Sequence, residues 1–240
     1  MKARILMQLG MTITGLLLLL VPAPARADFT FDLNVGNTSG PPLLSSFPGP
    51  YAQVDVHLTD STHATITFTS LTNSGNIYLM GDGSSVAVNL NATSWKLGSI
   101  TGSNAGTGFT PGPWSDAGSN QVDGFGTFNQ TFKSFDGFTH SSDTISLIVA
   151  NTGGTWGNAS DVLAANSDGH LAAAHIFVTS SPANANDTAY TTGYASDGTK
   201  QELSVVPAPS SIIAALTGMA LFGVIGIAGY RRRARVMLGA

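Results

Sequence analysis

Apolar and polar residues alternate along the central part of this chain, and this alternation constrains the fold more than any other feature. It is clear in Phe29-Phe31-Leu33-Val35, in Val54-Val56-Leu58 and in Ile66-Phe68. A period of two places successive side chains on opposite faces of a strand, whereas a helix needs a period near 3.6. We therefore expect a mainly β protein. Further strand candidates are residues 77–80, 86–90, 128–135, 144–150, 170–179 and 190–195.

Turn-forming clusters separate these candidate strands. They lie at 81–85, 101–108 and 151–158 and are rich in Gly, Asn, Asp, Ser and Thr. About eight short strands with such turns are typical of an antiparallel β-sandwich, and we expect one with jelly-roll-like connectivity over residues 28–178. Residues 98–120 have few strand formers, so we expect a long surface loop there. Residues 179–205 are expected to hold a last strand and a polar linker.

The charge balance of this body argues against one broad class of partner. Between residues 28 and 205 the chain has three lysines, no arginine and fourteen acidic residues, a net charge of −11. Such a body repels phosphate backbones, so we expect no nucleic-acid partner. Thirteen of the fourteen acids are Asp, which favours turns over helix interiors. The chain has no cysteine, which excludes disulfides and thiolate chemistry.

The N-terminal segment, residues 1–27, has the pattern of a secretory signal peptide. Its parts are a positive start, an apolar stretch and a small-x-small cleavage site, which correspond to Lys2 with Arg4, residues 5–21, and Ala25 with Ala27. We expect signal peptidase to cut after Ala27. The alternative is an uncleaved membrane anchor, but Pro22 and Pro24 would break its helix.

A second apolar run, residues 212–230, is expected to form a single transmembrane helix. Its nineteen uncharged residues, at about 1.5 Å rise each, span about 28 Å, close to the ~30 Å hydrocarbon core of a bilayer. An arginine cluster follows the run and should stay on the cytoplasmic side, which leaves the body outside. The cluster consists of Arg231, Arg232, Arg233 and Arg235.

The tetrapeptide Val206-Pro207-Ala208-Pro209 stands just before this run. Pro207 and Pro209 lack backbone N–H groups and bias their neighbours toward extended geometry, so the segment suits the cleft of a processing enzyme. The alternative is an ordinary single-pass anchor in which the two prolines only end a linker.

The order of Pro-x-Pro motif, membrane span and arginine cluster resembles the PEP-CTERM sorting tail of exported bacterial proteins, here residues 206–240. The resemblance implies an exosortase-type processing enzyme in the inner membrane. It also implies a final place on the cell surface or in the extracellular matrix of a Gram-negative-type bacterium. The family motif has Glu between the prolines, where this chain has Ala208. The stretches AAAHIFVTSSPANA and TGYAS look like ectodomains of the same sorted proteins, whose activity is not established.

The sequence contains none of the common catalytic motifs, such as HExxH, GxSxG or a P-loop, and we expect no enzyme. Residues 81–85, GDGSS, are interpreted as a hairpin turn. His57, Asp55 and His63 could form part of a metal site, but an exposed polar strand face is the favoured interpretation. His175 is interpreted as a hydrogen-bonded core or interface residue.

A structural calcium ion is the one cofactor that the composition suggests. Its candidate ligands are Asp116, Asp123 and Asp136, which lie among glycines. No EF-hand pattern accompanies them.

Three functions follow as hypotheses. The first is an exported, non-enzymatic surface or matrix protein that is sorted and processed through its tail. The alternative is a carbohydrate-binding module, associated with exopolysaccharide and calcium-dependent, whose exposed Trp95, Trp114 and Trp156 stack on sugars. The third is a secreted hydrolase, which would require that histidines and aspartates converge in one cleft.

Overall fold

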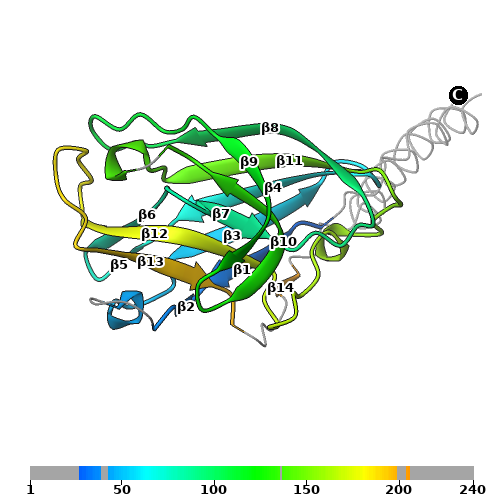
Figure 1. The fold of residues 1–240 in the computed structure, drawn as a ribbon, viewed down its shortest axis with the longest axis horizontal. Coiled ribbons are helices and arrows are strands. Elements are labelled where there is room, and N and C mark those ends of the chain that lie inside the picture. The colour runs from blue at the N-terminus through cyan, green and yellow to red at the C-terminus, as the bar shows by residue number, and fades with distance from the viewer. Residues whose placement is uncertain (1–26, 39–42, 136, 199–203, 206–240) are drawn as a thin grey trace, which may run out of the picture. The chain divides into compact units, whose positions relative to one another are not determined.

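The computed structural model describes residues 27–38, 43–135, 137–198 and 204–205, and they form two antiparallel sheets (Figure 1). Within these residues the first sheet has six strands in the order β14-β1-β3-β4-β11-β8. Their bounds are β1 Phe29–Leu33, β3 Ala52–Leu58, β4 His63–Ser70, β8 Trp95–Ser103, β11 Thr144–Asn151 and β14 Ser204–Val205.

The second sheet has the main strand order β2-β13-β12-β7-β10-β9, and β6 and β5 extend it beside β12. The bounds are β2 Val35–Gly36, β5 Thr72–Asn73, β6 Asn76–Met80, β7 Val86–Val88, β9 Ser115–Val122, β10 Gly126–Lys133, β12 Ala172–Ser180 and β13 Thr191–Ser196. Three short 3-10 helices lie in the described connections: η1 Leu44–Ser46, η2 Phe138–His140 and η3 Ala159–Asp161.

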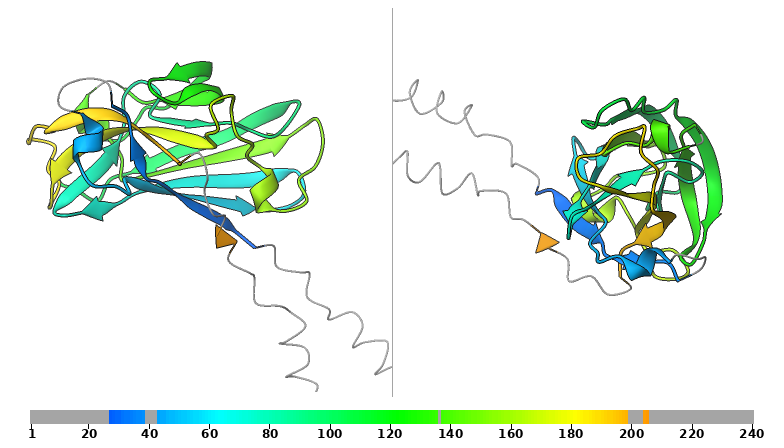
Figure 2. Two further views of the ribbon diagram at one scale, coloured as in Figure 1. Left: turned by 90° about the horizontal axis from the view of Figure 1, so that it is seen from below. Right: turned by 90° about the vertical axis from the view of Figure 1, so that its left-hand side faces the viewer.

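The two sheets face each other around a shared hydrophobic core, which makes the fold a β-sandwich (Figure 2). Val54, Val56 and Ile66 of the first sheet belong to the same buried cluster as Ile176 and Val178 of the second. Burial alternates along β3 and β1 with the period of two that the sequence predicts. The expectation of a mainly β, antiparallel fold is therefore confirmed.

The strand pairs are nested in the sequence. The β9·β10 pair lies inside β8·β11, which lies inside β7·β12, β2·β13 and finally β1·β14. Each pair joins segments that are farther apart along the chain than the pair inside it. The outermost pair aligns Phe29 with Val205, so the first and last described strands are neighbours.

Strand β12 is buried on both faces. Ala172, Ala174, Ile176 and Val178 point into the shared core, whereas Ala173 and Phe177 join two separate clusters on the outer face of the second sheet. Loop side chains, among them Phe109, Phe125 and Phe138, pack in those outer clusters. The apolar run that ends in Ile176-Phe177-Val178 favours a buried strand, and the structure confirms it.

The expectation of a long loop at 98–120 is wrong at both ends. Residues 95–103 form β8 and residues 115–122 form β9, so only the part between them is a loop. Both strands lie at sheet edges, where only one side of the backbone pairs. The side chains of β9 are mostly exposed, and no residue of β8 is fully buried. In β9, only Val122 is buried, and a strand of this kind has no apolar alternation to detect.

A β-bulge in β10 is stabilised by one asparagine side chain. The register of β10 against β9 shifts between Phe128 and Thr131. Beside the shift, Asn129 Oδ1 accepts from Leu90 N and Asn129 Nδ2 donates to Leu90 O, both at 2.8 Å. The side chain thus pairs both backbone groups of Leu90, two residues past the end of β7.

We predict that Asn129→Ala lowers the free energy of unfolding by about 2 kcal/mol, because both backbone groups of Leu90 lose their partners. Urea denaturation of the variant measures the loss. The matched control is Thr127→Ala, an exposed residue on the same strand, which should change stability by less than about 0.5 kcal/mol. Equal losses in the two variants would contradict the role given to Asn129.

Candidate functional site

The predicted sorting and topology residues lie outside the described residues. These are Ala25, Val206, Pro207, Ala208, Pro209, the span 212–230, Arg231, Arg232, Arg233 and Arg235. Ala27, the last residue before the predicted cleavage, is the first residue described. Within the described ranges, no helix is long and apolar enough to cross a membrane.

The histidines lie at separate places. Each Nδ1 bonds to a different partner: His57 to Asp28, His63 to Asp60, His140 to the Thr110 carbonyl, His170 to the Asp197 carbonyl and His175 to the Gly81 carbonyl. Asp55 accepts a hydrogen bond from Thr30, and the partner of His57 is Asp28. Among the described residues, no three His, Asp or Glu side chains lie close enough together to hold a metal ion.

The pair of His63 and Asp60 belongs to a short turn between β3 and β4. The backbone N–H and the hydroxyl of Thr62 both donate to Asp60 Oδ1, at 2.7 and 2.8 Å, and His63 adds further bonds. These hydrogen bonds, led by those from Thr62, hold the pKa of the exposed Asp60 carboxyl below its usual range. The His63 and Asp60 pair is therefore a local turn closure at the end of β3.

The calcium candidates do not share a site. Asp116 and Asp123 lie at opposite ends of β9, roughly 20 Å apart for a strand of this length. Asp116 Oδ1 accepts from Gly118 N and Gln130 Nε2, both at 2.7 Å, and Asp123 accepts from Asn37 Nδ2 at 3.2 Å. Asp136 lies outside the described residues.

The three tryptophans do not form an exposed stacking platform, so that part of the carbohydrate hypothesis is wrong. Trp156 is only 2% exposed, and Trp95 and Trp114 pack partly buried against the core. Trp95 Nε1 donates to Gln130 Oε1 at 3.0 Å, a bond between the two sheets. The indole N–H of a buried tryptophan usually donates to a partner within the protein, as Trp95 does here, and is then not available to a ligand.

The GDGSS segment is not a hairpin turn, in contrast to the sequence-based interpretation. β6 and β7 both run antiparallel to β12 along the same edge, with Met80 opposite Ile176 and Val86 opposite Ala174. Residues 81–85 are therefore an excursion from one interrupted strand, and a single residue, His175, lies opposite them. Gly81 N donates to His175 O, and His175 N donates to Ser85 O, which closes the excursion at both ends.

The His175 ring lies between a carbonyl and a hydroxyl group. Because Gly81 O can only accept, Nδ1–H donates to it at 3.0 Å, and in the neutral ring Nε2 then accepts from the Thr192 hydroxyl at 2.6 Å. The ring also stacks on Tyr194, with centroids 4.6 Å apart. Burial lowers the pKa of His175 below its usual 6.5, and the nearby Asp82 carboxylate and the Gly81 hydrogen bond offset part of this effect.

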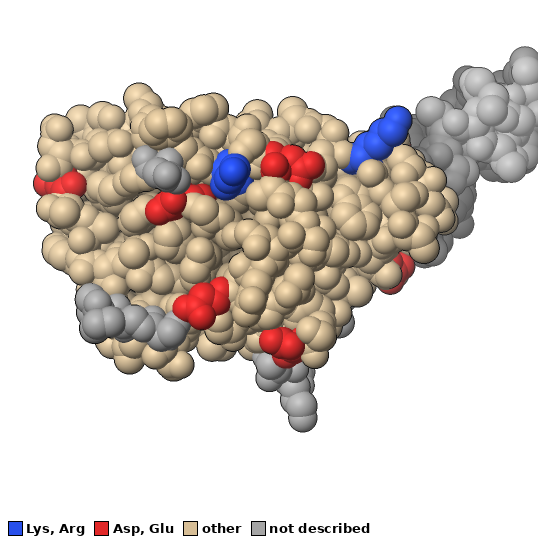
Figure 3. Space-filling model, in the orientation of Figure 1, with Lys and Arg blue, Asp and Glu red and all other residues tan. Residues whose placement is uncertain are grey.

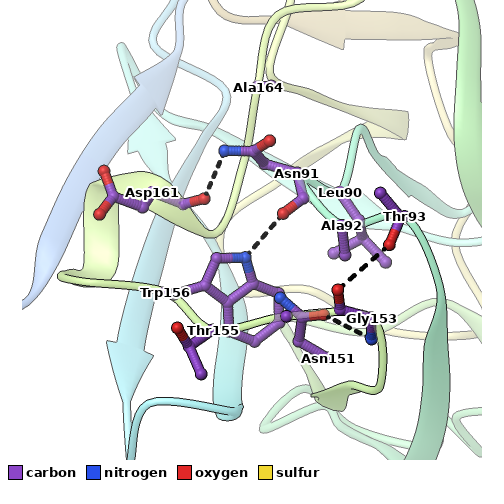
Figure 4. A pocket seen from close by; sticks show the side chains of 11 residues that line it. Leu90, Asn91, Ala92, Thr93, Asn151, Gly153, Thr155, Trp156, Asp161 and Ala164 are labelled. Atoms are coloured by element: carbon purple, nitrogen blue, oxygen red, sulfur yellow. Dashed lines mark hydrogen bonds between the residues drawn. The ribbon is translucent and has the colours of Figure 1, made fainter.

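A cavity of about 480 Å³ lies beside Trp156 (Figure 4), within the range of about 300–1,000 Å³ typical of small-molecule sites. Residues 90–93, between β7 and β8, form one wall of this Trp156 cavity, and the segment 151–156, which starts at the last residue of β11, forms another. Asp161 of η3 and Ala164 complete its lining. Trp156 N donates to Ser61 O, which fixes the second wall to the β3–β4 turn.

Hydrogen bonds join the walls of the cavity directly, as the dashed lines in Figure 4 show. Trp156 Nε1 donates to Asn91 O at 2.8 Å, and Asn91 Nδ2 donates to Asp161 O at 2.9 Å. Thr93 Oγ1 donates to Gly153 O at 3.3 Å, and a Cβ at position 153 would collide with that hydroxyl. The walls are thus positioned by contacts between residues more than fifty positions apart in the chain.

The fold and the cavity define a mainly β protein of two antiparallel sheets with a polar cavity between loops. No family model matches the chain, and no curated protein or solved structure is detectably similar to it.

We predict that the protein loses stability as the pH falls below about 6.5, partly through His175. The unfolded chain takes up a proton at this residue in that range, whereas the folded chain resists it, because its pKa is lowered. His175→Gln should flatten the difference in unfolding free energy between about pH 7.5 and about pH 5.5. The exposed His57→Gln is the matched control, and an equal flattening in both variants would refute this assignment.

Proposed function

We propose that this chain is an exported bacterial surface or extracellular-matrix protein, sorted and processed through a tail of the PEP-CTERM type, with a non-catalytic body. The observation that carries the proposal is the order of parts in the sequence. A signal-peptide pattern precedes Asp28, and Val206–Pro209, an apolar run and four arginines follow the body. Signal peptidase and an exosortase-type enzyme would be its processing partners.

The pairing of the two ends of the body supports this arrangement. Phe29 and Thr30, which follow the predicted signal-peptide cleavage, pair with Val205 and Ser204, which precede the sorting motif. A sandwich whose first and last strands are neighbours can be tethered at either end by the same sheet edge. The nested strand pairs also support our proposal that the connectivity is jelly-roll-like.

The composition of the described surface suits a role outside the cell. Charged side chains are sparse and well separated on the face shown in Figure 3. The outer face of the first sheet carries hydroxyl and amide side chains, such as Thr67 bonded to Ser146, together with carboxylates that accept from them, such as Asp32 from Gln53 and Asp55 from Thr30. A cysteine-free, polar sandwich of this kind keeps its fold without depending on the redox state of its surroundings.

We predict that the mature chain begins at Asp28 and lacks the peptide that contains Arg231 to Arg235. Mass spectrometry of both termini, on protein isolated from cells that produce it with its own processing enzymes, tests this directly. Replacing both Pro207 and Pro209 by Ser should leave the tail attached, because the extended segment loses its fixed geometry.

The chain supplies its own control for this experiment. Val21–Pro24 repeats the tetrapeptide Val-Pro-Ala-Pro within the predicted signal peptide. Replacing Pro22 and Pro24 by Ser should leave C-terminal processing unchanged. A mature chain that keeps Arg231 to Arg235 in the unaltered protein would replace the proposal with a permanent single-pass anchor.

A further inference from the structure

The Trp156 cavity has no charged group available to a ligand. Asp161 is the one ionisable residue of its lining. Its carboxylate accepts from Gly157 N and Asn158 N, both at 3.1 Å, and Figure 4 shows it pointing away from the cavity. The remaining polar lining consists of amides, hydroxyls and backbone groups, so the site is unsuited to phosphates, carboxylates or ammonium ions.

Asn151 is the residue that most clearly points to a ligand. Its side chain lines the cavity although the residue is only 7% exposed. Asn151 Oδ1 accepts from Gly153 N at 3.0 Å, which fixes the other end of the amide as the NH₂ group. Asn151 Nδ2 makes no hydrogen bond to the described residues, so this donor is available to a group in the cavity.

Acceptors lie in the other wall of the same cavity. Asn91 uses its Nδ2 to hold Asp161 O, and its Oδ1 has no partner among the described residues. The Thr93 hydroxyl donates to Gly153 O and can still accept. A group that both accepts and donates matches this combination, and a hydroxyl group is the simplest one.

We propose that the Trp156 cavity binds an uncharged saccharide unit. Asn151 Nδ2 donates to one sugar hydroxyl, and Asn91 Oδ1 and Thr93 Oγ1 accept from hydroxyl groups. Leu90, Ala92 and Ala164 supply the apolar surface that the C–H face of a sugar ring needs. Trp156 is structural here: it holds the walls together and does not stack on the ring. This inference goes beyond the proposed export and does not depend on it.

Gly154 offers a way to block the cavity without disturbing the fold. A Cβ at this position would meet a single neighbour within 4 Å, Asn151 Nδ2 at 3.9 Å, and the backbone there is not left-handed. A valine side chain at position 154 therefore enters the space beside the unpaired amide. Gly83 is the matched control, because a Cβ there meets no atom within 4 Å and the position lies outside the cavity.

The test is isothermal titration calorimetry on the full-length chain, kept in a detergent without a sugar headgroup. The probes are neutral tetrasaccharides of glucose, mannose, galactose and xylose, together with a tetrasaccharide of a uronic acid. At least one neutral probe should bind with one-to-one stoichiometry. Gly154→Val and Asn151→Asp should each weaken binding about tenfold or more, whereas Gly83→Val should leave it unchanged. Thermal unfolding of all three variants checks that they remain folded.

Three outcomes would overturn the proposal: no binding of any neutral probe, binding that Gly154→Val leaves intact, or preferred binding of the uronic-acid probe. If Asn151→Asp fails to fold, Gly154→Val with its Gly83→Val control still decides the question. None of these results bears on the processing of the tail, which the terminal mass spectra test separately.

Discussion

The double-sided burial of β12 is the constraint on which the rest of the structure depends. This strand pairs with β13 along one edge and with β6 and β7 along the other, and it contributes to the shared core as well as to the outer clusters. Because both edges and both faces are occupied, every neighbouring element must fit its register. The excursion at 81–85 shows the consequence: the partner strand is interrupted opposite His175, and the polar ring is satisfied by Gly81 and Thr192.

The sequence predicts the strands that bury a face and fails for those that do not. β1, β3, β4 and β11 bury alternate side chains, so their apolar residues recur with a period of two. β8 and β9 lie at sheet edges and show no continuous apolar alternation. In β8, Trp95, Leu97 and Ile100 pack only partly buried against the core, and a register shift between Leu97 and Ile100 breaks the period of two. The GDGSS segment differs from the predicted hairpin turn for a related reason. Turn residues show that the backbone leaves the strand, but they do not show whether the chain reverses direction or continues along the same neighbour.

The cavity could not be predicted from the sequence, because its walls are brought together by contacts between residues that are far apart in the chain. Asn91 and Asn151 are two of the many asparagines of this chain, and only the fold places both in the lining of the same cavity. From the sequence, the three tryptophans are the candidates for stacking on sugars. In the structure, the indole N–H of Trp95 donates to Gln130, and that of Trp156 donates to the Asn91 carbonyl. An indole N–H that already donates within the protein is not available to a ligand, whereas the Asn151 NH₂ group, which makes no hydrogen bond to the described residues, is available.

The position of the cavity connects it with the ends of the body. Residues 158–160, in and beside η3, line a small hollow together with Ala27, Asp28 and Phe29. The next residue of that turn, Asp161, lines the Trp156 cavity. The start of β1, and with it β14, therefore lies at the same end of the sandwich as the cavity. If the body is tethered through its terminal strands, a saccharide in the cavity is held near the tether. Release of the tail would then free the body without altering the loops that form the site, because neither wall of the cavity belongs to β1 or β14.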